Sequence, residues 1–228
     1  MDLKICLPER TYGGTERTVW ITFDTHYGHT NICRGVSKWH LPDGTVPIES
    51  TRPFATLEEM NKTIVDNINA CVGEDDILIH GGDFSFGGFE NIPLFRSLIN
   101  CKTIHLALGN HDDHIKRNKN GYKSLFTSVS DTILLDFEHG YNKNRVIIGH
   151  YPVQSWRDLN KGTFHIHGHC HLVGDRRFGN GRKMDAGIDG HPEFRPYDLF
   201  WECLVPLKSR DIKSDMPYDH HDKEFDKK

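Results

Sequence analysis

The sequence predicts a layered α/β fold in a single domain. Two patterns predict it: short apolar segments rich in β-branched residues recur along the chain, and one longer segment among them has the 3.6-residue apolar period of a helix. The length is a third indication, because 228 residues with 36% hydrophobic content are enough for one substantial core. We expect residues 1–207 to form this domain and residues 208–228, which are charged and poor in apolar side chains, to form a disordered tail.

Five strand-like segments run directly into turns that carry Asp, Asn or His. These segments are residues 18–23, 77–79, 103–108, 145–148 and 163–167. The turns that follow them read Asp24-Thr25-His26, Gly82-Asp83, Gly109-Asn110-His111-Asp112, Gly149-His150 and Gly168-His169-Cys170-His171. Glycines at these turns let the backbone come close to a ligand. Further strands are predicted over residues 132–137 and 199–205.

Residues 57–72 form the clearest predicted helix, since their apolar positions follow the helical period. Thr56 and Glu59 match a capping box at its start, and Gly73 stands where a helix is expected to stop. A second helix is predicted around residues 93–99. The segments 28–51 and 113–130 are mainly polar and have no period, so we expect loops there, with a short helix in the second.

The composition argues against several classes of protein. A formal net charge of -4 gives no broad attraction to nucleic acid or to anionic lipid. No apolar run approaches the ~18 residues of a membrane span, and the N-terminus has no signal-peptide pattern. Six dispersed cysteines without a Cys-x-x-Cys pair indicate neither a disulfide framework nor a thiolate zinc site. We therefore expect a cytoplasmic protein with free thiols.

The five polar turns contain more potential metal ligands than one ion needs. Functional groups gather at the carboxyl ends of strands in layered α/β folds, so we expect these turns to meet. Together they contain two Asp, one Asn and four or five His as candidate donors. A mixed oxygen and nitrogen set suits Mn, Fe, Zn, Ni or Co, and it does not suit calcium or a structural thiolate zinc site. Two ions about 3.5–4 Å apart that share a carboxylate would use such a set.

These five turns, in this order, resemble the signature of the calcineurin-like metallophosphoesterases. The resemblance covers roughly residues 18–190 and includes all five turns. The chain is also similar to small bacterial and phage-type members, through His29-Thr30-Asn31-Ile32, Arg52-Pro53-Phe54 and Glu58-Glu59-Met60-Asn61. One departure is Phe23, which stands before Asp24 where a small hydroxyl residue is common.

The resemblance implies a four-layer α/β/β/α sandwich with two mixed β-sheets flanked by helices. It implies that a first ion is held by Asp24, His26, Asp83 and His171, and a second by Asp83, Asn110, His150 and His169, with Asp83 bridging. Manganese is the favoured metal. The reaction would be hydrolysis of a phosphodiester or phosphomonoester by a hydroxide that bridges the ions. His111 would protonate the leaving oxygen, and Asp112 would orient His111.

Substrate contacts are predicted near the first and last turns. The candidates are His29, Asn31, Arg52, Arg176 and Arg177, because arginine binds phosphate in a bidentate manner and the others adjoin the first turn. For each, a solvated or supporting role is the alternative. The expected substrate is a small phosphorylated molecule, with nucleotides, cyclic nucleotides and nucleic-acid ends all open. The oligomeric state is left open as well.

Other histidines and acids have simpler interpretations. His165 and His167 lie within a predicted strand, where packing is more common than ligation. Cys170 is expected to point away from the ions. His80 and His105 are interpreted as core histidines. Asp185 and Asp189 are expected to serve the return of the chain to the sheet.

Two competing functions remain beside phosphoester hydrolysis. The first is a catalytically silent metal-binding regulatory or scaffold subunit, which would be favoured if the bridging Asp or the general acid were missing. Both Asp83 and His111 are present. The second is a different metallohydrolase, whose His-x-His block usually follows the N-terminal strand, whereas here that block comes last.

Overall fold

The computed structural model describes residues 1–7, 17–139 and 141–212, and these residues contain two five-stranded mixed sheets. Sheet A has the order β1-β6-β7-β8-β9, and sheet B has the order β10-β2-β3-β4-β5. The strands of sheet A are β1 Asp2–Leu7, β6 Thr132–His139, β7 Asn142–Gly149, β8 Phe164–His167 and β9 Lys183–Asp185. Those of sheet B are β2 Val19–Thr22, β3 Ile77–His80, β4 Thr103–Ala107, β5 Ser128–Ser130 and β10 Tyr197–Asp198.

The strands that carry the polar turns run parallel within each sheet. In sheet B, β2, β3, β4 and β5 are parallel, and β10 is antiparallel to β2. In sheet A, β7, β8 and β9 are parallel, while β6 is antiparallel to β7 and parallel to β1. Parallel neighbours end at the same edge of a sheet, so the turns after them are brought together.

The main core lies between the two sheets. Burial alternates along β6 and β7, and the buried set Ile133, Leu135, Val146 and Ile148 packs with Ile21 and Ile79 of sheet B in one cluster. This alternation is the two-residue period of a strand with one face in a core. The predicted α/β fold with two mixed sheets is confirmed.

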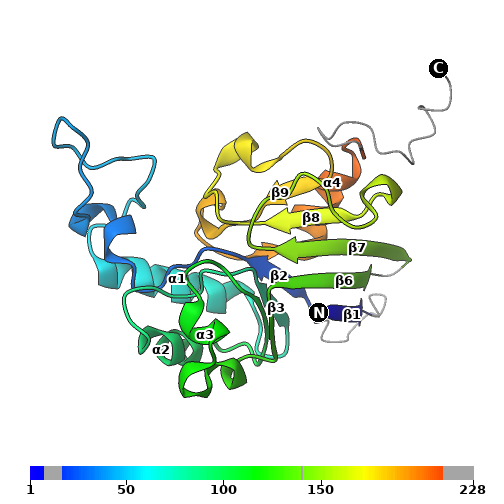
Figure 1. Ribbon diagram of the computed structural model, residues 1–228, viewed down its shortest axis with the longest axis horizontal. Coiled ribbons are helices and arrows are strands. Elements are labelled where there is room, and N and C mark those ends of the chain that lie inside the picture. The colour runs from blue at the N-terminus through cyan, green and yellow to red at the C-terminus, as the bar shows by residue number, and fades with distance from the viewer. Residues whose placement is uncertain (8–16, 140, 213–228) are drawn as a thin grey trace.

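Helices cover the other face of sheet B (Figure 1). They are α1 Leu57–Cys71, α2 Asn91–Leu98 and α3 Asp113–Lys116. The Thr56 side chain accepts a hydrogen bond from Glu59 N, as the capping box predicts. Met60, Ile64 and Ile68 are fully buried one helical turn apart against Leu78 and Ile104 of the sheet.

On the outer face of sheet A, the segment 151–162 packs against β8. His165 lies between two core-facing residues of β8, so its ring points away from the core. Trp156 lies 5.3 Å from that ring, and Val153 N donates to His165 Nε2 at 3.3 Å. The imidazole is therefore a packed and hydrogen-bonded group of the sheet.

The predicted last strand is wrong. Residues Leu199–Leu204 form a π-helix and Val205–Lys208 form helix α4, after the two-residue strand β10. Asp198 Oδ1 accepts hydrogen bonds from Phe200 N and Trp201 N and so starts the helical turns. A short apolar run fits a buried strand and a buried helix equally well, and here Leu199, Cys203 and Leu204 are buried in the core between the sheets.

Four strands were not predicted, namely β1, β5, β9 and β10. The segment 28–51 is loop with two 3-10 turns, η1 Thr30–Ile32 and η2 Arg34–Val36, and 113–130 contains α3, η3 Lys119–Leu125 and β5. The remaining short turns are η4 Leu159–Lys161, η5 Gly174–Arg177 and η6 Ile188–Gly190.

Of the predicted tail, Lys208 belongs to α4, and residues 213–228 lie outside the described part. Within the described residues no helix is long and apolar enough to cross a membrane.

Candidate metal centre

The five polar turns meet where the carboxyl ends of the two sheets adjoin. Within sheet B, Asp24 N donates to Gly82 O at 3.0 Å and His26 N donates to Asp83 O at 3.0 Å. Within sheet A, Gly168 N donates to His150 O at 3.1 Å. The sheets are joined by His169 N, which donates to Asp24 Oδ2 at 2.9 Å. Hydrogen bonds donated by backbone amides thus hold the turns together.

Two groups of side chains are close enough to hold a metal ion. The first is Asp24, His26 and His171, and the second is Asp24, Asp83 and His150, with ligand atoms within 4.8 Å of one another in each group. The groups share Asp24, whereas the sequence resemblance implies Asp83 as the bridge. Asp83 Oδ2 lies 3.5 Å from His26 Nε2 and 3.4 Å from His150 Nε2, so this oxygen also stands between the two groups.

Asn110 and His169 complete the cluster on its exposed side. Asn110 Oδ1 lies 2.9 Å from His150 Nε2 and 3.0 Å from His169 Nδ1. All of the predicted ligand residues are therefore together in one place, while ligation itself stays a prediction. The buried members are Asp24, His26, Asp83 and His150. Because Asn110, His111 and His169 are exposed, the site is open to solvent on this side.

The buried polar atoms of the cluster fit a bound cation. Asp24 Oδ1 and His26 Nδ1 are buried, and neither has a hydrogen-bond partner among the residues that the structure describes. Burial raises the pKa of Asp24 to about 7 and lowers the pKa of His26 well below its ordinary value. A buried polar atom without a partner is costly, and a metal ion would both satisfy a carboxylate oxygen and restore its charge.

The backbone of the cluster is held in an unusual conformation. Asp24, His26, Asp83, His169 and His171 all have positive φ, between 48° and 69°. Residues other than glycine rarely adopt this region, and such conformations gather at functional sites. A close approach also needs Gly168, where a Cβ atom would lie 2.5 Å from Asp24 Oδ2.

Asp189 and Arg52 support the cluster from behind. Asp189 Oδ2 lies 2.7 Å from His171 Nδ1, and Arg52 Nε and Nη2 donate to the two Asp189 oxygens at 2.7 and 2.8 Å. Arg52 also donates to the carbonyls of Asp24 and Thr25 at 2.6 and 2.8 Å. A carboxylate on the second ring nitrogen of a histidine fixes its orientation toward a metal. The sequence predicts only that Asp189 serves the return of the chain to the sheet, and it does not indicate this contact with His171.

The predicted phosphate contact of Arg52 is corrected by this geometry. Its side chain is 1% exposed, and all three guanidinium nitrogens already donate to protein oxygens. Burial of a charged group requires such pairing. Arg52 therefore braces the first turn and is not directed at substrate. Arg52 has this role because it pairs with Asp189, which lies 137 residues away. No local sequence motif contains both residues, so the sequence alone does not indicate the pair.

The predicted role of Asp112 is also corrected. Its carboxylate accepts hydrogen bonds from Gly109 N, Asp83 N and Phe84 N, at 2.8, 2.8 and 3.0 Å, and does not contact the His111 ring. Burial raises the pKa of Asp112 to about 6, and these hydrogen bonds oppose the rise. Asp112 thus ties the third turn to the second and positions Asp83.

His111 is positioned by Asp83 through the backbone. His111 N donates to Asp83 Oδ1 at 2.8 Å. The His111 ring packs edge-on against His26 at 5.5 Å and against Phe86 at 4.9 Å between centroids. An exposed imidazole beside the ligand cluster and outside it is placed to exchange a proton with a bound molecule.

The other predicted contact residues have supporting neighbours. His29 Nδ1 accepts from Ile32 N at 3.2 Å, and its ring lies 5.4 Å from that of His26. Asn31 Oδ1 accepts from Lys38 N at 3.1 Å, which supports the loop. The Arg177 guanidinium lies 5.2 Å from the Tyr197 ring centre, and Arg176 is exposed in η5.

The remaining histidines match their simpler interpretations. His80 Nε2 lies 2.8 Å from Thr25 Oγ1, and His105 Nδ1 lies 2.7 Å from Ser128 Oγ. His167 is buried within β8 with Nδ1 3.0 Å from Gly168 O. Cys170 is exposed and belongs to neither candidate metal group.

Comparison with known proteins finds one similar sequence and one similar solved structure, and neither name states an activity. An uncharacterized protein of Methanocaldococcus jannaschii is 29% identical over 157 residues, which are 68% of this chain and 70% of that protein. A crystal structure of a protein of unknown function from Aquifex aeolicus is similar with a TM-score of 0.52 and 18% identity, covering 79% of this chain and 94% of that one. No protein-family profile matches the chain. The fold therefore also occurs in the Aquifex protein, and the similarity does not identify a reaction.

Proposed function

We propose that this protein is a two-metal phosphoesterase of the calcineurin-like type. The observation that carries the proposal is the convergence of seven candidate ligands, from five turns and both sheets, on one place that includes Asp83. His111 stands beside them and outside the ligand set. Metal-assisted hydrolysis of phosphoesters uses ligands for two metal ions and a separate acid that protonates the leaving group.

Different residues of this chain would have different roles in the proposed reaction. When bound, two divalent ions supply positive charge to the phosphate oxygens and make a coordinated water more acidic. Asp83 holds the backbone of His111 in place, and a ring nitrogen of His111 donates a proton to the leaving oxygen. Asp189 and Arg52 keep His171 and the first turn in position. Manganese is the favoured metal, with Fe, Zn, Ni and Co as alternatives.

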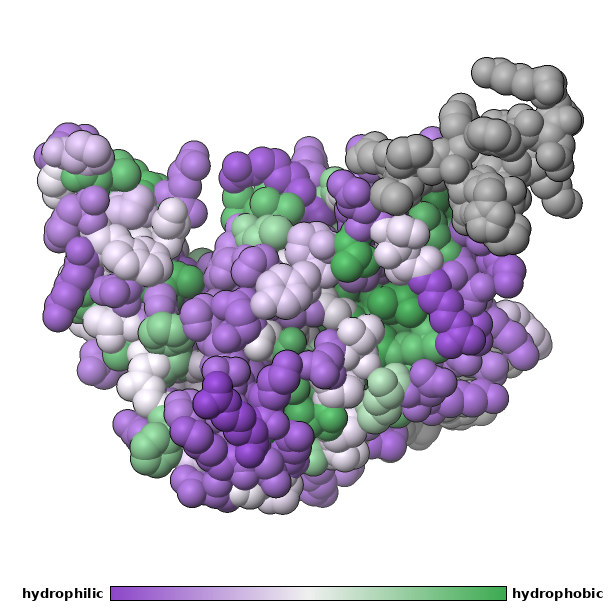
Figure 2. Space-filling view, in the orientation of Figure 1, coloured by the Kyte–Doolittle hydropathy of each residue, from purple (hydrophilic) through white to green (hydrophobic). Residues whose placement is uncertain are grey.

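The proposed substrate is a small phosphorylated molecule, a nucleotide or a nucleic-acid end. The part of the long loop at residues 37–50, here called the arm, projects from the body, and a hollow separates it from the segment after β8 (Figure 2). Trp39 on the arm is 40% exposed, with its ring 5.7 Å from that of His29. The rings of His26, His29 and Trp39 thus lie next to one another, from the ligand cluster to the arm. An aromatic leaving group could stack on the exposed ring of Trp39.

The test is hydrolysis of bis(p-nitrophenyl) phosphate with manganese, before and after chelation. Activity should appear with metal, disappear with chelator and return when metal is restored. Asp83→Ala is the matched inactive control. Metal binding without any turnover would favour the silent regulatory subunit, and absence of chelator-sensitive turnover with every first-row metal would overturn the proposal.

A further inference from the structure

A second cavity, of about 610 Å³, lies at the opposite end of β7 from the metal centre. Its lining comes from the start of β7, the segment before β8, the first residue of β8, Arg182 before β9, and the end of α4. Arg145 on its wall is five residues before His150, which corresponds to roughly 16 Å along a strand. The cavity is therefore separate from the candidate metal centre.

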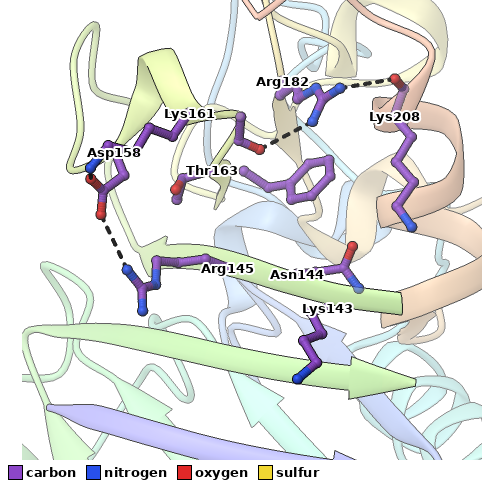
Figure 3. Close-up of a pocket in the computed structure, with 10 residues that line it drawn as sticks. Lys143, Asn144, Arg145, Asp158, Lys161, Thr163, Arg182 and Lys208 are labelled. Atoms are coloured by element: carbon purple, nitrogen blue, oxygen red, sulfur yellow. Dashed lines mark hydrogen bonds and ion pairs between the residues drawn. The ribbon is translucent and has the colours of Figure 1, made fainter. Parts of the chain in front are cut away.

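The register of sheet A creates this cavity. β7 begins at Asn142, but its pairing with β8 begins only at Val146. The first half of β7 therefore has no strand beside it on that edge, and the chain 158–163 and α4 border the gap. Asn144 is 8% exposed, and its side chain points into the cavity (Figure 3).

The walls of the cavity carry an excess of positive charge. The charged lining residues are Lys143, Arg145, Lys161, Arg182, Lys208 and a single acid, Asp158. Asp158 is already shared between Arg145 at 3.2 Å and Lys161 at 2.9 Å. Its negative charge is thus unavailable to the two cations on the other side of the cavity.

Arg182 and Lys208 are these two cations, and neither forms an ion pair with the described residues. Arg182 donates to the carbonyls of Gly162 and Lys208, each at 3.2 Å, and its buried Nε has no hydrogen-bond partner in the described part of the chain. The Lys208 ammonium donates to Asn142 Oδ1 at 2.9 Å. Two like charges that line one cavity, with no acid of the described residues paired to either, are unfavourable, and a bound anion would offset this cost.

We propose that this cavity is a binding site for a small phosphate-bearing anion, independent of the phosphoesterase activity. Arg182 contributes a planar guanidinium, Lys208 an ammonium and Asn144 an amide to the lining of this one cavity (Figure 3). Asn144 distinguishes the site from an ordinary basic surface, because it is a buried amide at the floor of a gap in the sheet.

Asn144→Asp tests the site with a nearly unchanged side-chain shape. The full-length, metal-loaded protein is titrated with pyrophosphate by calorimetry, and binding at the metal centre serves as an internal reference. We expect Asn144→Asp and Lys208→Gln each to weaken the second binding event at least 10-fold. The control Asn100→Asp adds the same charge at an exposed position and should leave both events unchanged.

Crystals soaked in tungstate locate the anion directly. Density is expected among Arg182, Lys208 and Asn144, in addition to any density at the metal centre. Pyrophosphate binding that is the same in Asn144→Asp and wild type, or tungstate density at the metal centre alone, would overturn the proposal. Binding of citrate without binding of pyrophosphate would overturn the assignment to phosphate. Thermal melts of both variants show whether a loss of binding reflects a loss of folding.

Discussion

At the scale of single residues, the site depends on side chains that no local motif contains. Asp189 and Arg52 are 137 positions apart and form an ion pair, with Arg52 buried, that holds both His171 and the carbonyl of Asp24. Ligand residues are recognisable because they occur in turns after strands. A residue that acts by holding a ligand can come from anywhere in the chain, so its role is visible only in three dimensions.

Asp189→Asn should weaken metal binding without removing any ligand. The amide loses the ion pair with Arg52 and no longer holds His171 Nδ1 as a carboxylate does. We expect a loss of about 10- to 100-fold in manganese affinity, measured by competition with a fluorescent chelator. Unfolding by urea should show destabilisation of about 3 kcal/mol, because the buried Arg52 charge is left unpaired. The exposed control Asp175→Asn should change neither quantity, and unchanged affinity in Asp189→Asn would refute the role.

His111→Ala should separate catalysis from metal binding. Its ring contacts His26 but belongs to neither candidate metal group, so metal content should stay at the wild-type level. We expect kcat to fall by about 100- to 10,000-fold with loss of the acid. Asp83→Ala should lose both metal and activity. Metal content is measured by inductively coupled plasma mass spectrometry, and equal metal loss in the two variants would contradict the division of roles.

At the scale of elements, the strands that lead into the polar turns and the long helix were predicted best. The five strands that lead into polar turns, and helix α1 with its cap, lie within two or three residues of their predicted bounds. The segment 199–205 was mistaken because an apolar run without a clear period does not distinguish a buried strand from a buried helix. The strand β9 has three residues and β10 has two, too few for any period to emerge.

The arm of residues 37–50 is the element that we expect to select the substrate. Trp39→Ala should raise KM for an aromatic or nucleotide phosphoester by roughly 5-fold or more, since a stacked base contributes about 1–3 kcal/mol. The value of kcat should stay within about 2-fold, because Trp39 lies beyond His29 and outside the ligand cluster. Steady-state kinetics with thymidine 5'-monophosphate p-nitrophenyl ester measures both constants.

Matched variants on the arm control for a general change in its structure. Trp39→Phe retains a ring and should recover most of the affinity. Leu41→Ala removes a side chain of similar exposure, 46%, and should leave KM unchanged. An equal rise of KM in Trp39→Ala and Leu41→Ala would indicate that the arm affects substrate binding only through its overall conformation and that the Trp39 ring does not contact the substrate.

At the scale of the whole molecule, the candidate metal centre lies where the two sheets meet. Asp24, Asp83 and Asn110 follow strands of sheet B, while His150, His169 and His171 follow strands of sheet A. Besides the apolar core, hydrogen bonds such as that from His169 N to Asp24 Oδ2 join the sheets at this edge. A bound ion would therefore link both sheets directly.

Metal binding should consequently stabilise the entire domain. An ion at about 100 times its Kd adds about 2.7 kcal/mol to the free energy of unfolding. For a chain of this size the melting temperature should rise by roughly 5–10 °C, as measured by differential scanning calorimetry with manganese and then with chelator. Asp83→Ala should show no metal-dependent shift. A melting temperature that is the same with and without metal in the wild type would contradict a site shared by both sheets.

The sequence by itself determined the strand-and-turn units, the long helix and the candidate ligand set, because each depends on residues that are neighbours in the chain. Only the tertiary structure decided the roles of Arg52, Asp112 and Asp189, the helical end at 199–208 and the basic cavity beside β7. These features depend on which segments pack together and in which register. Hydrogen bonding and ion pairing act over a few ångströms in space, and separation along the chain does not report that distance.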